Sequence, residues 1–218
     1  MSQYARVEEL LIVVVGGGLS AVVAHLAGWW ALVPAFLAAA LLAFYRDPQR
    51  QSPTAGDLVL APADGRVVEI ARHVPGPDGT GRLRIMIFLS VFDVHVNRSP
   101  CAGRVAEVQY RPGQFVNALS AAADTRNECN TITLEPAPPL PGPISVRQIA
   151  GILARRIVCA VQPGDRLTAG QRFGMIKLGS RTEVCLPESP DWEVLVEAGR
   201  QVYAGLTPLL RLRTTKVT

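Results

Sequence analysis

Two stretches of the sequence contain a side chain that could move a proton during a reaction. His95 lies in the alternating run Val94–Val96, within FLSVFDVHVNRSPCAG at residues 88–103. Asp64 precedes a glycine in APADGRV at residues 61–67. A histidine titrates near neutral pH and can act as a general acid or base, whereas an ionised aspartate can orient such a group or balance its charge. Each also has an ordinary interpretation, His95 as a half-exposed strand residue and Asp64 as part of an Asp-Gly turn.

The sequence offers few other acid–base groups or metal ligands. Of the three histidines, His25 lies in an apolar N-terminal segment, and His73 precedes the Pro/Gly-rich residues 75–79, where we expect it to be solvated. The four cysteines form no CxxC pair and no Cys/His cluster with zinc-like spacing, so the sequence predicts no metal site. A disulfide framework is not expected in a chain of this size, and we interpret the cysteines as buried or incidental thiols in a reducing compartment.

A third stretch, RFGMIKLGSRTEVCLP at residues 172–187, places Gly179-Ser180 between two strand-like runs. A serine hydroxyl is a potential nucleophile, but this serine is not part of a GxSxG motif, so a hydrolase triad of the α/β type has no support. Taken alone, the dipeptide is best interpreted as a hairpin turn. Any catalytic role for Ser180 therefore depends on the sequence around it.

The composition indicates which elements must position these residues. The chain has 218 residues, of which 49% are hydrophobic and 18% charged, so it is too apolar to be intrinsically disordered. Its mean hydropathy of +0.22 is high for a soluble enzyme and indicates a membrane-embedded stretch. The net charge of +4 suits an anionic membrane surface or a phosphate-bearing ligand, and it is too small to indicate nucleic-acid binding.

The membrane-embedded stretch is Leu10–Phe44, which contains no Asp, Glu, Lys or Arg. A transmembrane helix needs about 20 apolar residues, so this segment is long for one span and short for two. Gly28 and Pro34 interrupt it, and we predict two short helices near residues 10–27 and 30–44. They would form a hairpin that dips into the bilayer or barely crosses it.

The charges that flank this segment predict its orientation. Arg6 precedes it, and Arg46 and Arg50 follow it. A hairpin would place all three on the cytoplasmic side, as the positive-inside rule favours. Two other interpretations stay open: a cleaved signal peptide, for which the segment is long, and a helical pair buried inside the globular domain.

Residues 51–218 have the pattern of a mainly β domain, and residues 1–50 are expected to form the membrane-associating part. Short β-branched runs alternate with Gly- and Pro-rich turns, and no long segment has helical periodicity. The pattern predicts a β-sandwich or barrel. Glu135–Pro143, which contains five prolines, is predicted to be an exposed loop. The predicted strands are Val67–Ile70, Leu83–Leu89, Arg104–Tyr110, Thr131–Leu134, Ile152–Ala160, Arg172–Leu178, Glu183–Leu186 and Glu193–Val196.

Seven motifs along the chain resemble the phosphatidylserine decarboxylase family, in its short bacterial and archaeal form, which includes archaetidylserine decarboxylases. Each motif alone is weak, but together they cover nearly the whole chain in the order that the family uses. They are FYRDPQR (44–50), APADGRV (61–67), FLSVFDVHVNRSPCAG (88–103), YRPGQFVNA (110–118), RNECN (126–130), RQIAGILARRI (147–157) and GDRLTAGQRFGMIKLGSRTEV (164–184).

The resemblance implies a proenzyme that cuts itself between Gly179 and Ser180. The Ser180 hydroxyl would attack the Gly179 carbonyl, and elimination would leave two chains, residues 1–179 and residues 180–218, that stay associated. The second chain would begin with a pyruvoyl group derived from Ser180. This covalent cofactor would form a Schiff base with the amine of the substrate phosphatidylserine and act as an electron sink while CO₂ leaves, yielding phosphatidylethanolamine.

The resemblance also implies roles for other residues. His95 matches the family's general acid/base, and Asp64 matches its aspartate motif, which would orient or charge-stabilise a base near Ser180. Long-form members have a second histidine three residues after the one that matches His95. Here Arg98 holds that position, so the base for self-cleavage is left open. Candidates for contact with the lipid phosphate, which could also be solvated surface charges, are Arg98, Arg111, Lys177 and Arg181.

Two alternatives to phosphatidylserine decarboxylation stay open at the level of sequence. One is the same chemistry on an archaetidylserine-type lipid, because tail preference depends on shape. The other is a non-catalytic, membrane-tethered β-sandwich that binds a partner, which predicts an intact chain. For the enzyme we expect a place at the cell membrane, in contact with anionic lipid, with the active domain on the cytoplasmic side. A homodimer is one state that the sequence allows.

Overall fold

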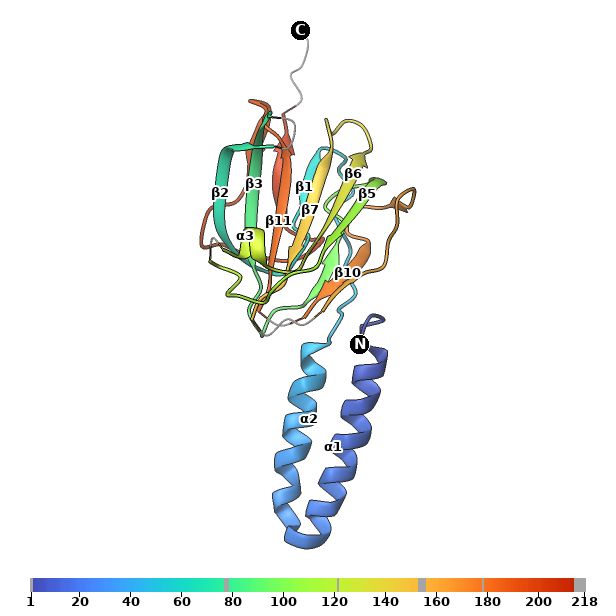
Figure 1. The fold of residues 1–218 in the computed structure, drawn as a ribbon. Coiled ribbons are helices and arrows are strands. Elements are labelled where there is room, and N and C mark those ends of the chain that lie inside the picture. Colours follow the sequence, from blue (N-terminus) through green and yellow to red (C-terminus); the bar gives the residue numbers. More distant parts are fainter. Residues whose placement is uncertain (1, 77–78, 121, 153–155, 178, 214–218) are drawn as a thin grey trace. The chain divides into compact units, whose positions relative to one another are not determined.

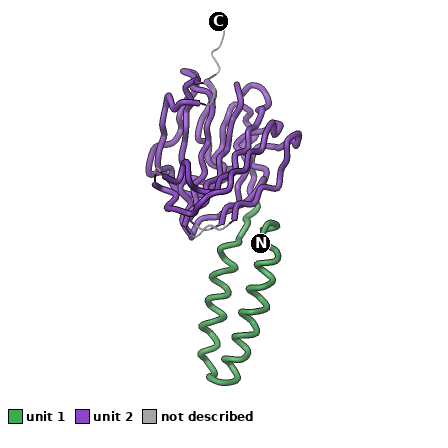
Figure 2. Tube along the Cα trace, viewed as in Figure 1, with its two compact units in different colours: residues 1–49 green, residues 50–218 purple. Residues whose placement is uncertain are grey.

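The computed structural model describes residues 2–76, 79–120, 122–152, 156–177 and 179–213. The chain forms two compact units, residues 1–49 and residues 50–218 (Figure 2). The first unit is helical and the second is built mainly from strands (Figure 1). The predicted class, a mainly β protein with N-terminal apolar helices, is confirmed.

The first unit consists of two helices that pack against each other. α1 (Arg6–Ala27) and α2 (Leu32–Phe44) are joined by a short 3-10 helix, η1 (Gly28–Ala31), so the two predicted helices are present with shifted starts. The helices approach closely because Gly16 has no side chain. A Cβ atom at this position would lie 2.5 Å from the Ala38 Cβ.

The apolar side chains of this unit face outward. Leu26 and Phe36 are 78% and 73% exposed, and none of the most apolar stretch of Arg6–Phe44 is buried. The segment is long and apolar enough to cross a membrane. The structure therefore contradicts the alternative interpretation of this segment as a helical pair buried inside the globular domain.

The second unit is organised around an eight-stranded sheet whose paired strands are antiparallel. β11 lies between β3 and β7 near its centre (Figure 1). In spatial order the strands are β13 (Gln201–Val202), β2 (Gly65–Pro75), β3 (Gly81–Phe88), β11 (Arg181–Pro187), β7 (Ile144–Ile149), β6 (Cys129–Pro136), β5 (Gly103–Arg111) and β9 (Arg166–Leu167).

Two three-stranded sheets complete this unit. One has the order β1 (Leu58–Leu60), β14 (Pro208–Leu212), β12 (Trp192–Val194), and the other has the order β4 (Val96–Arg98), β10 (Arg172–Ile176), β8 (Ile157–Cys159). All three sheets contribute fully buried side chains to one core, for example Val59, Phe173 and Val184. Complete burial of such a side chain contributes about 1.5–3 kcal/mol, so the core holds the three sheets together.

Two differences from the predicted strands affect the site. The predicted strand Ile152–Ala160 is too long, because β8 covers only Ile157–Cys159, Ile152 lies outside any strand, and residues 153–155 are outside the described part of the chain. Leu178, at the end of another predicted strand, is likewise not described. β7 is absent from the predicted strands, because its polar residues Arg147 and Gln148 interrupt the apolar run.

One end of the large sheet gathers the loops that contain the predicted site residues. Phe88, Arg181, Ile149, Cys129 and Arg111 are successive partners across five neighbouring strands, from β3 to β5. Beyond this row lie the turn before Arg181, the loops that follow β3 and β7, and the loop between β5 and β6. We call this region the Ser180 end of the sheet.

Candidate active site

Ser180 lies where the chain crosses between two sheets, immediately before β11. The flanking strands β10 and β11 belong to different sheets, so Gly179-Ser180 is not a hairpin turn. Gly179 has a φ of 64°, in the left-handed region that glycine tolerates best. Ser180 is fully buried, and its carbonyl accepts a hydrogen bond from the Leu89 amide at 2.9 Å.

The Ser180 hydroxyl is unusual for a buried polar group. Its Oγ is buried and has no hydrogen-bond partner among the residues that the structure describes. Leaving a buried hydroxyl unsatisfied costs free energy, so such a group calls for an explanation. A nucleophile with available lone pairs provides one.

His95 is fully buried just before β4, not half-exposed on a strand. Its Nδ1 lies 2.9 Å from the carbonyl oxygen of Asp93. Because a carbonyl oxygen only accepts, Nδ1 must donate, and the proton that His95 can gain or lose is the one at Nε2. Nε2 is itself buried, which shields a proton there from bulk water. His73, in contrast, is exposed on β2, as predicted.

Asp64 is buried and paired with an arginine. Its two carboxylate oxygens accept hydrogen bonds from Arg50 at 2.5 and 2.8 Å, and Oδ1 also accepts one from the Ala204 amide at 2.8 Å. The Arg50 and Asp64 side chains are only 7% and 5% exposed, so removing either partner would leave an uncompensated buried charge. The sequence predicts Arg50 only as a charge that flanks the apolar segment, and its contact with Asp64 becomes visible only in the fold.

A buried hydrogen-bond cluster joins the three segments that contain the predicted catalytic residues. The Asn97 side-chain amide donates to the Pro62 carbonyl and to the Thr182 hydroxyl, each at 3.4 Å. Each of these residues lies two positions along the chain from a predicted catalytic residue. Asn97 is two positions from His95, Pro62 from Asp64, and Thr182 from Ser180.

Two further amides extend this cluster across the large sheet. Gln148 of β7 donates to the Asn97 side-chain oxygen at 2.8 Å, and Asn130 of β6 donates to Gln148 at 2.8 Å. All three side chains are buried. The sequence alone does not identify these three residues as part of the site, although each lies inside one of the seven motifs. The signal that could have identified them is a polar amide side chain within an otherwise apolar strand.

The four predicted phosphate ligands have different surroundings. Arg98 is buried and donates to the Gly170 carbonyl at 3.1 Å. Arg111 is exposed at the Ser180 end, and Lys177 is half-buried after β10. Arg181, next to Ser180, is only 2% exposed.

Arg181 connects β11 with the long loop between β5 and β6. Its Nη1 donates to the Ala118 carbonyl at 2.7 Å. Its Nη2 forms ion pairs with Asp124, in the short helix α3 (Ala123–Arg126), and with Glu183 at 2.9 Å. Arg147 pairs with the same two carboxylates, at 3.9 Å from Asp124 and 3.5 Å from Glu183, so the charges form one cluster that holds the loop close to Ser180.

Cys101 and Cys185 have the properties expected of unreactive thiols. All four are free, and Cys101 and Cys129 are buried. Burial raises the pKa of Cys101 to about 12, and burial together with the Glu183 charge raises the pKa of Cys185 to about 11. Both thiols are therefore protonated at neutral pH, and a thiol is a much weaker nucleophile than a thiolate.

Comparison with known proteins assigns the family. The family model described as phosphatidylserine decarboxylase matches residues 37–209. A relative from Rhodopirellula baltica is 46% identical over 208 residues, covering 93% of this chain and 85% of the relative. A relative from Ruegeria pomeroyi is 45% identical over 174 residues, 78% of each chain. One from Solibacter usitatus is 44% identical over 193 residues, covering 88% of this chain and 89% of the relative.

All three relatives are named phosphatidylserine decarboxylase proenzyme. The matched residues include the eight-stranded sheet and the segments of Ser180, His95 and Asp64. The family model and the names of the relatives define an enzyme of the decarboxylase class. The chain belongs to the phosphatidylserine decarboxylase family, which confirms the resemblance of its motifs.

Proposed function

We propose that the protein is a self-processing decarboxylase that converts phosphatidylserine to phosphatidylethanolamine in phospholipid biosynthesis. The observation that carries this proposal is the buried Ser180, whose hydroxyl lacks a hydrogen-bond partner among the described residues and which follows a left-handed glycine. The names of the relatives favour phosphatidylserine over an archaetidylserine-type lipid as the substrate.

The self-cleavage uses atoms of Gly179 and Ser180, a base and water. Oγ of Ser180 attacks the Gly179 carbonyl carbon, the C–N bond breaks, and an ester replaces the amide while the freed nitrogen takes a proton. A base then removes the Ser180 α-proton, and the Cβ–Oγ bond breaks, leaving Gly179 as a carboxylate and residue 180 as an N-terminal dehydroalanine. The imine tautomer of this residue reacts with water and releases ammonia, leaving a pyruvoyl group.

The residues at the Ser180 end fit a pyruvoyl group. Ser180 has the β-oxygen that must leave, and its burial keeps the resulting ketone away from bulk water. The group supplies an electron sink for the bond to CO₂ that breaks. His95 delivers the proton to the substrate carbon from Nε2, while its Nδ1–H bond to the Asp93 carbonyl fixes the ring. Either His95 or Asp64, acting through water, serves as the base for self-cleavage.

The helical unit supports a place at the membrane. Its apolar segment is long enough to cross a bilayer and is not buried in the structure. Arg6 and Arg46 flank this segment, and the preference of cationic residues for the cytoplasmic face favours the cytoplasm as the side of the active domain.

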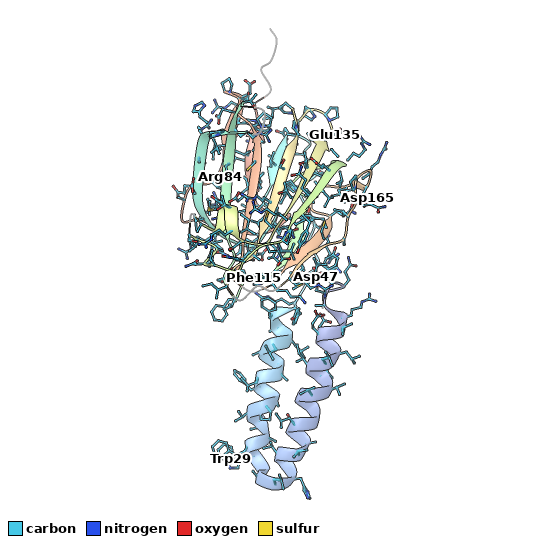
Figure 3. The ribbon with its side chains drawn as sticks, in the orientation of Figure 1. Trp29, Asp47, Arg84, Phe115, Glu135 and Asp165 are labelled. Carbon is cyan, nitrogen blue, oxygen red and sulfur yellow. The ribbon has the colours of Figure 1, made fainter. Side chains whose placement is uncertain are left out.

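The Ser180 end of the β-rich unit has the surface chemistry of a lipid-facing region. Phe92, Phe115 and Ile152 are exposed in three different loops there, and Figure 3 shows Phe115 at this end. Arg111 and Arg126 are exposed at the two ends of the Phe115 loop. Apolar side chains beside cations favour an anionic bilayer surface, which is where the phosphatidylserine headgroup lies.

The two processed chains are expected to stay associated, because strands on both sides of the cut share one sheet. β11 follows the cut and pairs with β3 on one side and with β7 on the other, both of which precede the cut. β14 likewise pairs with β1. Cutting the peptide before residue 180 removes none of these pairings.

The proposal predicts that the purified protein contains two polypeptides. Intact mass spectrometry should find residues 1–179 and residues 180–218, with the second chain lighter than a serine-initiated chain because a pyruvoyl group replaces its first residue. Edman degradation of this chain should be blocked. A single uncut chain in a preparation that decarboxylates phosphatidylserine would refute the mechanism, and an uncut, inactive chain would favour the membrane-tethered binding module.

Deleting residues 1–44 should give a more soluble protein that still cuts itself, because the core and the Arg50–Asp64 pair belong to the second unit. Chain cutting is measured on a denaturing gel, and activity is compared on short-chain and bilayer phosphatidylserine. Activity on the short-chain lipid should persist better, because the deleted segment supplies the membrane partition.

Deletion of residues 1–50 provides the matched comparison, because it also removes Arg50. The Asp64 carboxylate would then be buried without its ion-pair partner, which typically costs about 3–5 kcal/mol. This longer deletion should unfold at a lower temperature and cut more slowly than the shorter one. If the shorter deletion neither folds nor cuts, the helices are part of the folded core and the proposed division of the chain is wrong.

A further inference from the structure

Gly151 lies at the Ser180 end, two residues after β7, and it is buried. It is not among the glycines with a positive φ, so its backbone conformation does not require glycine. The requirement is spatial: a Cβ atom at residue 151 would lie 1.7 Å from the carbonyl oxygen of Gly179 and 2.9 Å from its carbonyl carbon. Outside their own residue and its chain neighbours, Cβ atoms essentially never come within 3.0 Å of a heavy atom. The carbonyl of the cut-site glycine thus occupies the space of a side chain on residue 151.

The residue before Gly151 is held by two hydrogen bonds. The Ala150 amide donates to the Glu128 carbonyl at 3.0 Å, and the Ala150 carbonyl accepts from the Asn127 side chain at 2.7 Å. Any Cβ on residue 151 would therefore displace the Gly179 carbonyl more readily than it would displace this anchored backbone.

A second residue lies close to this position. The Ala118 Cβ would lie 3.4 Å from the added atom, and the Ala118 carbonyl is bound by Arg181, the residue after Ser180. Gly151 and Ala118 thus form a fixed surface beside the Gly179 carbonyl, and Arg181 ties that surface to the strand that begins after Ser180.

We propose that Gly151 is a positioning residue for self-cleavage, which leaves room for the Gly179 carbonyl where the Ser180 hydroxyl attacks it. This inference rests on the proposed self-processing function. Attack makes the carbonyl carbon tetrahedral and moves its oxygen, so the oxygen needs space as well as a defined starting position. Misplacing a reacting group by about 1 Å can cost about 10²-fold in rate.

The test compares Gly151→Ala with Gly81→Ala in the full-length chain. Like Gly151, Gly81 does not have a positive φ. A Cβ atom at residue 81 would lie 3.6 Å from its nearest neighbour, an atom of His73, which is an ordinary van der Waals contact. Chain cutting is followed over time on a denaturing gel. Gly151→Ala should cut about 10²-fold more slowly than the wild type, whereas Gly81→Ala should cut at the wild-type rate.

A folding control separates a positioning role from a structural one. Gly151→Ala is combined with Ser180→Ala, and thermal unfolding of this uncut protein is compared with that of Ser180→Ala alone. Both should unfold cooperatively. Loss of the cooperative transition would overturn the inference, because Gly151 would then be required for the fold. Normal cutting of Gly151→Ala would overturn this inference alone, whereas a wild-type chain that never cuts would overturn the proposed function as well.

Discussion

Replacing Ser180 by alanine should leave the chain in one piece and abolish decarboxylation. Alanine has neither the hydroxyl that attacks the Gly179 carbonyl nor a leaving group at Cβ, so no ester and no pyruvoyl group can form. Because the Ser180 Oγ has no hydrogen-bond partner among the described residues, removing it should cost the fold little. The measurements are the chain length on a denaturing gel and CO₂ release from phosphatidylserine.

Two further variants make this result specific. Ser180→Cys keeps a β-leaving group and should still cut, although more slowly. Ser189→Ala makes the same serine-to-alanine change in the turn between β11 and β12 and should cut and decarboxylate normally. Decarboxylation by the uncut Ser180→Ala protein would show that residue 180 is not the source of the reactive carbonyl.

Replacing His95 by glutamine should lower CO₂ release per pyruvoyl group by about 10²–10⁴-fold, the usual contribution of a general acid or base. The glutamine amide lies where His95 Nε2 lies, and it cannot give up a proton at neutral pH. His95→Asn is compared with it, because the asparagine amide lies where Nδ1 lies and can still donate to the Asp93 carbonyl. A similar loss in both variants reflects proton transfer and not the loss of that hydrogen bond. Turnover is divided by the amount of pyruvoyl group, so that incomplete maturation does not distort the comparison.

The matched control is His73→Gln, because His73 is exposed and should tolerate the change. Asp64→Asn should behave differently from His95→Gln: it should chiefly slow self-cleavage, while the molecules that mature keep measurable turnover. The reason is that Asp64 is paired with Arg50 and is suited to electrostatic support, not to proton delivery. A matured His95→Gln protein with the wild-type rate per pyruvoyl group would show that another residue is the acid.

The parts of the fold that depend on local pattern can be predicted from the sequence. β3 and the centre of β11 contain the apolar runs expected of strands, and the apolar segment before residue 45 matches the helical unit. β7 cannot be found in this way, because Gln148, which is polar, is fully buried in it. Its burial is compensated by the amides of Asn97 and Asn130, which are distant in sequence, and no local pattern contains that information.

The candidate site also depends on contacts between residues that are distant in sequence, which no local pattern contains. The motifs single out Ser180, His95 and Asp64, but a glycine and a serine between two strand-like runs look like a hairpin turn. Only the topology shows that β10 and β11 lie in different sheets. Similarly, the alternating pattern around His95 predicts half-exposure, whereas His95, just before β4, is fully buried. The pairing of Arg50 with Asp64 is a contact in space, which neither residue's neighbours indicate.

After the proposed cut, the central place of β11 would change the kinetic order of refolding. In the precursor, β11 reaches its position between β3 and β7 as part of the same molecule, so the reaction is unimolecular. After the proposed cut, β11 and the strands that follow it belong to a separate polypeptide. A denatured mature enzyme must then reassemble from two molecules, and its recovery falls with dilution, whereas that of the Ser180→Ala precursor does not. Processing would thus make refolding depend on the meeting of two polypeptides, which the uncut precursor does not require.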